Sequence, residues 1–191
     1  MKIAVVSNHG PTFVRFRGEL LRALVDEGHE VVAYVPPVCQ NLVDEITGRG
    51  VTFYPYPLDR TSTNPLRDWK SYTALKERMA LDRPEVVFSY TAKPMIYGSL
   101  AASRNDVGRI VSLVTGLGYG FSGVNLKQRV LSSLQRLLYR FALRRNARVV
   151  FQNPDDRELF VRWGLVSEQQ SEVVAGSGIN GDDYIFLSKN S

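Results

Sequence analysis

The chain has 191 residues, of which 44% are hydrophobic and 23% are charged, a size and composition typical of one globular domain with a substantial core. Its formal net charge of +5 indicates a mild attraction to anions such as nucleotides, phosphates, nucleic acid or an anionic membrane surface. The single cysteine, Cys39, excludes an intrachain disulfide and a thiolate metal site, and no stretch reaches about 18 apolar residues, so we expect a cytoplasmic protein that touches a membrane at most peripherally.

Short runs of β-branched residues alternate with longer amphipathic segments along the whole chain. This alternation is typical of a parallel sheet with helices on both faces, so the sequence predicts a Rossmann-like, doubly wound α/β domain with a mostly parallel sheet of about seven strands. In chain order, the expected elements are strand Ile3–Val6, a helix with Leu20, Leu21, Leu24 and Val25 on one face that ends at Gly28, strand Val31–Val35, helix Asn41–Thr47, strand Val51–Tyr54, helix Pro65–Leu81, strand Val86–Ser89, helix Met95–Ser103, strand Arg109–Val114, helix Asn125–Arg145, and strands Arg148–Phe151 and Glu172–Ala175.

The longest predicted helix, Asn125–Arg145, has two faces that differ in character. Apolar side chains at three- and four-residue spacings form a stripe, which in a surface helix packs toward the core. The opposite face is basic, because three arginines fall within roughly 40° of one another at about 100° per residue. The stripe consists of Val130, Leu134, Leu137, Leu138 and Phe141, and the basic face of Arg129, Arg136 and Arg140.

The loops that follow the strands are the candidate sites, because ligands of open α/β sheets bind at the carboxyl ends of the strands. The loop Ser7–Thr12 offers backbone N–H groups and a helix N-terminus to an anion, although a tight turn also explains its Gly and Pro. The segment Tyr90–Pro94 combines a phenol, the hydroxyl of Thr91 and the ammonium of Lys93, which suits sugar hydroxyls or a phosphate. Lys93 is equally compatible with a solvated surface position.

A third loop, Thr115–Gly123, contains four glycines between a strand and the longest helix. Gly118, Gly120 and Gly123 spell the G-x-G-x-x-G pattern of dinucleotide-binding domains. That pattern belongs after the first strand, with an acidic residue about 20 positions further on, and neither condition is met here. A P-loop pattern is also missing from the sequence, so we expect no nicotinamide, flavin or other cofactor.

His9 is the only residue whose position suits a general acid or base, and it could equally be a hydrogen-bonding loop residue. His29 lies at a helix-to-strand turn on the far side of the sheet and is expected to be structural. Two histidines and one cysteine leave few ligands for a metal site or members for a catalytic triad, so no metal is expected.

Four segments together resemble family 4 retaining glycosyltransferases of the GT-B fold, and especially the bacterial branch that builds surface polysaccharides and glycan precursors on a lipid carrier. The segments are Lys2–Gly18, Pro84–Ala102, Ile110–Phe121 and Val173–Ile179. The Thr-Gly-Leu-Gly-Tyr run that begins at Thr115 is the most specific of them. The sequence departs from many relatives after the fourth strand, where Ser89, Tyr90 and Thr91 stand in place of a histidine.

The resemblance implies an enzyme with two Rossmann-like domains that moves a sugar from a nucleotide-diphosphate donor to an acceptor, with retention and without a metal. Residues 1–180 would be its N-terminal, acceptor-side domain and residues 181–191 a tail, while the donor-binding domain is absent from this sequence. Gly10 would lie near the donor phosphates, and Gly176, Ser177 and Gly178 would lead into the hinge. The residues expected to line the cleft are Asn8, His9, Gly10, Thr12, Tyr90, Thr91, Lys93, Thr115, Gly116, Gly118, Tyr119, Gly120 and Phe121.

The expected partners follow from the same resemblance: a nucleotide-diphosphate sugar, bound mainly by the other domain, and a glycan or polyprenyl-linked acceptor. Such an acceptor lies at an anionic membrane surface, to which Arg129, Arg136 and Arg140 could attach the domain with on the order of 1 kcal/mol per residue, although an ordinary solvated helix face explains the same three arginines. An exposed apolar surface near Leu117, Tyr119 and Phe121 predicts self-association. No nucleic-acid partner is expected. Two alternatives stay open: a non-catalytic binding or scaffold module, and a nucleotide-sugar epimerase of related fold.

Overall fold

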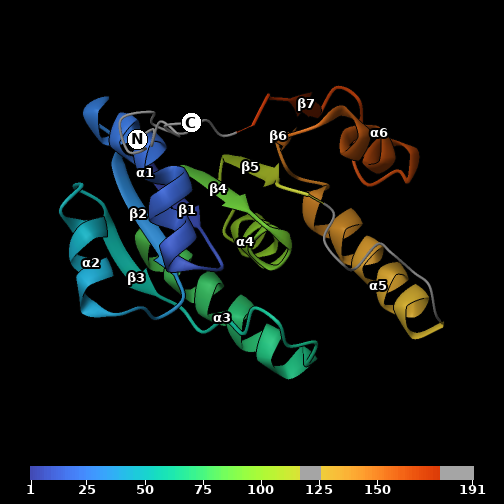
Figure 1. Cartoon of the computed structure of the whole chain (residues 1–191), viewed down its shortest axis with the longest axis horizontal. Coiled ribbons are helices and arrows are strands. Elements are labelled where there is room, and N and C mark those ends of the chain that lie inside the picture. The colour runs from blue at the N-terminus through green and yellow to red at the C-terminus, as the bar shows by residue number, and fades with distance from the viewer. Residues whose placement is uncertain (117–125, 177–191) are drawn as a thin grey trace, which may run out of the picture.

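The computed structural model of the chain describes residues 1–116 and 126–176, with only the backbone of residues 126–131 (Figure 1). It is a seven-stranded, wholly parallel sheet in the order β3-β2-β1-β4-β5-β6-β7, so the predicted Rossmann-like α/β fold is confirmed. The elements are β1 (Lys2–Val6), α1 (Gly10–Asp26), β2 (Glu30–Val35), α2 (Gln40–Thr47), β3 (Thr52–Pro55), α3 (Pro65–Asp82), β4 (Val86–Tyr90), α4 (Ala92–Arg104), β5 (Arg109–Val114), α5 (Leu126–Leu143), β6 (Arg148–Phe151), α6 (Pro154–Arg162) and β7 (Ser171–Val173).

The chain changes direction across the sheet between β1 and β4. From β1 it runs outward through β2 to β3, then returns to β4 on the other side of β1 and continues outward to β7. Figure 1 shows α2 and β3 at one end of the sheet and β7 and α6 at the other. Because Val6 pairs with Ser89, the carboxyl ends of β1 and β4 lie side by side. This is the topological switch point, where open α/β sheets bind their ligands.

Side chains of β1 alternate between two hydrophobic layers, as expected for a strand buried on both faces. Ile3 and Val5 belong to the layer that α1 and α2 cover, and Ala4 and Val6 to the layer that α3 and α4 cover. A third cluster joins β5 and β6 to the helices α4, α5 and α6. The core is therefore divided between both faces of the sheet, and the strand ends stay free for a site.

Helix α1 buries a face that differs in part from the expected one. The fully buried turns lie early in the helix, and Leu20 is 40% exposed, while Leu24 and Val25 are only partly buried. The buried residues are Gly10, Phe13, Val14, Arg17, Gly18 and Leu21. They follow three- and four-residue spacings. Because the charged Arg17 is one of them, hydrophobicity alone does not identify this face as the buried one.

Helix α5 is turned opposite to the expectation. Three members of the predicted core-facing stripe, Leu134, Leu137 and Phe141, are exposed, and a fourth, Leu138, is partly buried against the third cluster. The fully buried side chains of α5 include Tyr139, Ala142 and Leu143. The guanidinium of Arg136, expected on the basic outer face, lies 3.8 Å from the ring centroid of Trp163, which follows α6. A cation–π contact of this kind draws the arginine inward. The side chains of Arg129 and Val130 lie outside the described part.

Helix α6 was not predicted, although its start carries clear signals. Asn153 caps it, since its side-chain oxygen accepts a hydrogen bond from the backbone N–H of Asp156 at 2.8 Å, and Pro154 occupies the first turn. The buried ring of Phe160 holds the helix against the third cluster. Over residues 1–116 and 126–176, no helix is long and apolar enough to cross a membrane.

Candidate functional site

A cavity of about 700 Å³ opens at the switch point, at the carboxyl edge of the sheet. Its walls come from the segments that follow β1, β4, β5, β6 and β7, from α1, and from the connection between β3 and α3. The lining residues are Asn8, His9, Thr12, Phe16, Arg17, Arg60, Tyr90, Thr91, Thr115, Gln152 and Gly176. The volume is in the range of small-molecule sites.

The structure brings together seven residues that the sequence singled out: Asn8, His9, Thr12, Tyr90, Thr91, Thr115 and Gly176. Sequence reasoning missed Phe16, Arg17, Arg60 and Gln152. Gln152 directly follows β6, so the rule that strand ends carry the site could have found it. Arg17 lies within a helix and Arg60 in a connection without regular secondary structure, and no local sequence pattern marks either residue as part of a site.

His9 is the N-cap of α1. Its Nδ1 accepts a hydrogen bond from the backbone N–H of Thr12 at 3.4 Å, and its carbonyl accepts one from the Thr12 hydroxyl at 3.1 Å. An accepting Nδ1 leaves the proton of the neutral ring on Nε2. His9 is therefore the hydrogen-bonding loop residue of the second interpretation, and its use as an acid or base stays a prediction.

Two tyrosines hold the loop after β1 in place. The Tyr90 hydroxyl donates to Oγ of Ser7 at 2.8 Å, and the Tyr56 hydroxyl donates to the Ser7 carbonyl at 2.8 Å. All three side chains are buried. Burial is the main reason that the pKa of Tyr90 is raised, to about 12, so Tyr90 is a neutral hydrogen-bond donor at physiological pH. The backbone beside the cavity is thus fixed before any ligand binds.

Arg17 reaches the cavity from the inner face of α1, and only 5% of it is exposed. Its guanidinium carbon lies 4.7 Å from the ring centroid of Tyr90, and Nη1 donates to the carbonyl of Phe16 at 2.9 Å. Nε has no hydrogen-bond partner, and within the described ranges no carboxylate forms an ion pair with this residue. Burial lowers the pKa of Arg17, but an arginine stays protonated in proteins.

Thr91 borders the cavity in a strained conformation. Its backbone has φ 67° and ψ 157°, a region that almost only glycine occupies, and a β-branched residue there costs on the order of 1–3 kcal/mol. The Thr91 hydroxyl is buried, has no hydrogen-bond partner in the structure and does not cap α4, although Thr91 is the residue that precedes this helix. Strain and an unsatisfied hydroxyl coincide at one wall of the cavity.

Lys93 does not line the cavity, contrary to the prediction, and it is not a solvated surface lysine either. It lies in the first turn of α4, and its Nζ donates to the carbonyls of Asp59 and Ser62 at 2.7 and 2.6 Å and to a carboxylate oxygen of Asp68 at 2.6 Å. The Tyr97 hydroxyl donates to the other carboxylate oxygen of Asp68 at 2.9 Å. Lys93 therefore ties the β3–α3 connection to α4.

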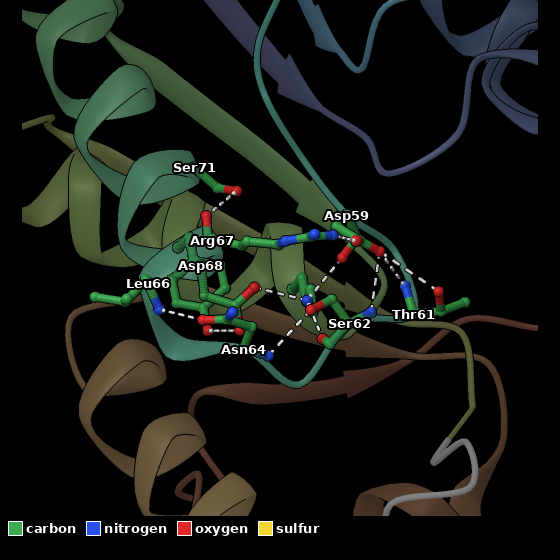
Figure 2. A network of polar contacts seen from close by, with 10 residues as sticks. Asp59, Thr61, Ser62, Asn64, Leu66, Arg67, Asp68 and Ser71 are labelled. Atoms are coloured by element: carbon green, nitrogen blue, oxygen red, sulfur yellow. Dashed lines mark hydrogen bonds and ion pairs between the residues drawn. The ribbon is translucent and has the colours of Figure 1, made fainter.

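Figure 2 shows how this connection is held from within. The carboxylate of Asp59 accepts hydrogen bonds from the backbone N–H groups of Thr61 and Ser62 and pairs with Arg67 on α3. The bond from the Ser62 amide, followed by the bond from Arg67, lowers the pKa of Asp59. Arg60 lies between these fastened neighbours and lines the cavity, and none of the described carboxylates pairs with it.

Gly10 and Gly116, two further predicted cleft residues, are absent from the cavity wall. A Cβ added to Gly10 would lie 2.4 Å from Cγ1 of Val38 and 2.8 Å from Cδ2 of Leu42. Gly10 is therefore a packing residue between α1 and the α2 region, and its place near the donor phosphates stays a prediction. Gly116, with φ +136°, is exposed. The remaining predicted residues, Gly118, Tyr119, Gly120, Phe121, Ser177 and Gly178, lie outside the described residues.

A doubly wound sheet with a cavity at its switch point and two arginines in the cavity wall has the architecture of domains that bind small molecules at the carboxyl ends of their strands. The chain belongs to the glycosyl transferase 4-like domain family, whose pattern matches residues 14–175. It is also 28% identical over 185 residues to the N,N'-diacetylbacillosaminyl-diphospho-undecaprenol alpha-1,3-N-acetylgalactosaminyltransferase of Campylobacter jejuni. The match covers 94% of this chain and 47% of that enzyme, so the chain spans about half the length of this relative.

Solved structures show the same fold at low identity. The MurG structure of Acinetobacter baumannii aligns with 96% of this chain and 48% of its own, with a TM-score of 0.58 at 14% identity. The UDP-GlcNAc 2-epimerase of Neisseria meningitidis, bound to UDP-GlcNAc, aligns with 93% of this chain and 47% of its own, with a TM-score of 0.65 at 12% identity. Glycosyltransferases and epimerases therefore share this architecture, and the family match favours the former.

Proposed function

We propose that this chain is the acceptor-side domain of a glycosyltransferase that moves a sugar from a nucleotide-diphosphate donor to a glycan or lipid-linked acceptor with retention. The observation that carries the proposal is the cavity at the switch point, with Arg17 and Arg60 in its wall, of a chain that belongs to the glycosyl transferase 4-like family. The similar Campylobacter enzyme is named for a transfer to a diphospho-undecaprenol acceptor, which supports an acceptor of this chemistry.

The domain would supply acceptor contacts and leave most donor contacts to a second domain. Residues 1–180 form the proposed unit, and a partner domain would close over the carboxyl edge of the sheet. Asn8, His9, Thr12, Thr91 and Thr115 offer hydroxyl, amide and imidazole groups at that edge, a set suited to sugar hydroxyls. These groups position an acceptor, so their loss should raise the acceptor KM more than it lowers kcat.

Helix α5 is the proposed membrane contact, with a different set of residues from the sequence-based one. Leu134, Leu137 and Phe141 are exposed by 52%, 50% and 59%, and Arg140 beside them is exposed as well. Apolar and basic side chains on one outward surface suit attachment to the interface of an anionic membrane. Arg136 is engaged with Trp163 and does not contribute.

Vesicle flotation tests this attachment and separates it from self-association. The chain should float with vesicles that contain anionic lipid and not with neutral ones, and Leu137→Asp should abolish flotation. Sedimentation of the chain without lipid tests the alternative that a second copy of the chain packs against Leu134, Leu137 and Phe141. Concentration-dependent dimers that Leu137→Asp disrupts, without flotation, would replace the membrane by self-association.

A transfer assay tests the proposed activity itself. A protein that comprises this chain and a donor-binding domain, encoded in frame or by a neighbouring gene, should transfer sugar from one member of a panel of uridine- and guanosine-diphosphate sugars to a polyprenyl-diphosphate-linked acceptor. Products are separated by chromatography, and the anomeric configuration is read by NMR. Conversion of the donor sugar to its epimer without transfer would assign the epimerase alternative instead.

A further inference from the structure

The cavity contains two arginines that the described part of the protein does not neutralise. Arg17 is buried, and its guanidinium contacts a tyrosine ring and a backbone carbonyl, while Nε has no partner. Arg60 enters the same cavity from the β3–α3 connection. Because a buried charge is unfavourable unless it is paired, the burial of Arg17 is best explained by a ligand that carries the missing negative charge, and the exposed Arg60 adds a second positive charge at the same cavity.

Two other features lie at the wall of the same cavity. The hydroxyl of Thr91 is buried without a partner, and its strained backbone holds it at the cavity wall. Helix α1 begins at the cavity, since His9 is its cap and Thr12 lies in its first turn. The first turn of α1 offers its dipole rather than free N–H groups, because Pro11 has no N–H and the Thr12 N–H is bonded to His9. The dipole is independent of the two arginines and favours the same sign of charge.

We propose that Arg17, Arg60 and the Thr91 hydroxyl form a subsite for a diphosphate group. The guanidinium of arginine is planar, and its fork of N–H donors fits two phosphate oxygens, whereas a hydroxyl donates to a third. This inference rests on the proposed function and extends it, because both substrates of that reaction carry a diphosphate: the nucleotide sugar and the lipid-linked acceptor. The shared ligand chemistry is therefore a diphosphate ester.

Lys93 is the positioning residue of this subsite. It binds the carbonyls of Asp59 and Ser62, on either side of Arg60 along the chain, and anchors them to Asp68. Lys93 thereby fixes the backbone on both sides of Arg60 and so limits where the Arg60 side chain can lie. Loss of Lys93 should weaken diphosphate binding through Arg60, and this loss should vanish in an Arg60→Gln background.

Calorimetric titration of the 191-residue chain with inorganic pyrophosphate tests the subsite without requiring transfer. We expect Arg17→Met and Arg60→Gln each to weaken binding by about 10- to 100-fold, the usual effect of losing a charged hydrogen-bond partner. Arg17→Lys keeps the positive charge but lacks the planar set of N–H donors, so its pyrophosphate affinity should lie between those of wild type and Arg17→Met. Arg109→Gln, at the opposite edge of the sheet, removes the same charge and should bind as wild type does.

A stability measurement keeps the test decisive if Arg17 has a structural role. Because Arg17→Met removes an unpaired buried charge, its melting temperature should equal or exceed that of wild type while binding is lost. A lower melting temperature with unchanged pyrophosphate affinity would make Arg17 a packing residue and overturn the subsite. So would equal affinities of wild type for pyrophosphate and malonate, or equal affinities of Arg60→Gln and Arg109→Gln for pyrophosphate.

Two further ligands identify the source of the diphosphate. Tighter binding of UDP than of farnesyl diphosphate assigns the subsite to the donor, and the reverse order assigns it to the acceptor. Either order supports the subsite, and no measurable binding of pyrophosphate, UDP and farnesyl diphosphate overturns it. Because transfer is measured separately, a protein that binds diphosphates but transfers no sugar retains the subsite and loses only the proposed function.

Discussion

Two polar regions flank the same cavity and are built in opposite ways. Around Lys93, the charges that hold the β3–α3 connection are paired: the ammonium is shared by one carboxylate and two carbonyls, and Asp59 pairs with Arg67. Around Arg17 and Thr91, a guanidinium nitrogen and a hydroxyl are buried with no partner. A satisfied network stabilises the fold, whereas an unsatisfied one stores unfavourable free energy that a ligand can relieve. The contrast separates scaffold from site.

The strongest test of this contrast is Lys93→Met. It leaves Asp68 and two carbonyls without their cation, so we expect the free energy of unfolding to fall by about 3 kcal/mol, as for a broken buried ion pair. Urea unfolding followed by circular dichroism measures the change. Lys70→Met, on the exposed side of α3, is the matched control and should differ from wild type by less than about 0.5 kcal/mol. An equal loss in both variants would contradict the role of Lys93.

Arg17→Met tests the unsatisfied region around Arg17 and should change the free energy of unfolding in the opposite direction to Lys93→Met. Replacing an unpaired buried cation with an apolar chain of similar length should raise the free energy of unfolding by about 2 kcal/mol. The same urea titration measures it. A decrease of similar size would show that the stacking of Arg17 on Tyr90 outweighs the burial of its charge, and the two regions would then both be scaffold.

Tyr90 contacts both Ser7 and Arg17, and its raised pKa predicts that the free energy of unfolding depends on pH. The folded protein holds the phenol proton up to about pH 12, while the unfolded chain releases it near the ordinary value of about 10. Stability is therefore complete below about pH 10 and falls between the two values, by at most about 1.4 kcal/mol per pH unit from this group. In Tyr90→Phe the decline should be shallower by that amount, as measured by urea unfolding at several alkaline pH values.

Thr91→Gly is the mildest change and should relieve backbone strain. Glycine adopts φ 67° readily, so we expect a gain of about 1 kcal/mol, reduced in part by the greater entropy of glycine in the unfolded chain. Thermal unfolding measures the change. Thr73→Gly, in the interior of α3, is the contrasting control and should lose roughly 0.3–0.5 kcal/mol. A loss in both variants would show that Thr91 is not strained in solution.

The strands and the loops that follow them could be predicted from the sequence, because β-branched runs and turn residues are local signals. This is why Asn8, His9, Tyr90, Thr91 and Thr115 were placed at one edge and are found around one cavity. Lys93 and Gly10 were also placed there, but neither lines this cavity. One belongs to an ion-pair network with α3 and the other to a helix contact, and both depend on segments far away in the chain.

The sequence by itself determined the α/β class, the order of the elements except α6, and the edge at which a site must lie. Only the tertiary structure decided which side of α5 faces inward, because Trp163 draws Arg136 toward the domain against the helix's own apolar pattern. It also decided that Arg17 is buried without a counter-charge and that Arg17 and Arg60 line the same cavity. Periodicity records the average preference of one segment for water, whereas partners from other segments determine where each charged side chain has its lowest free energy.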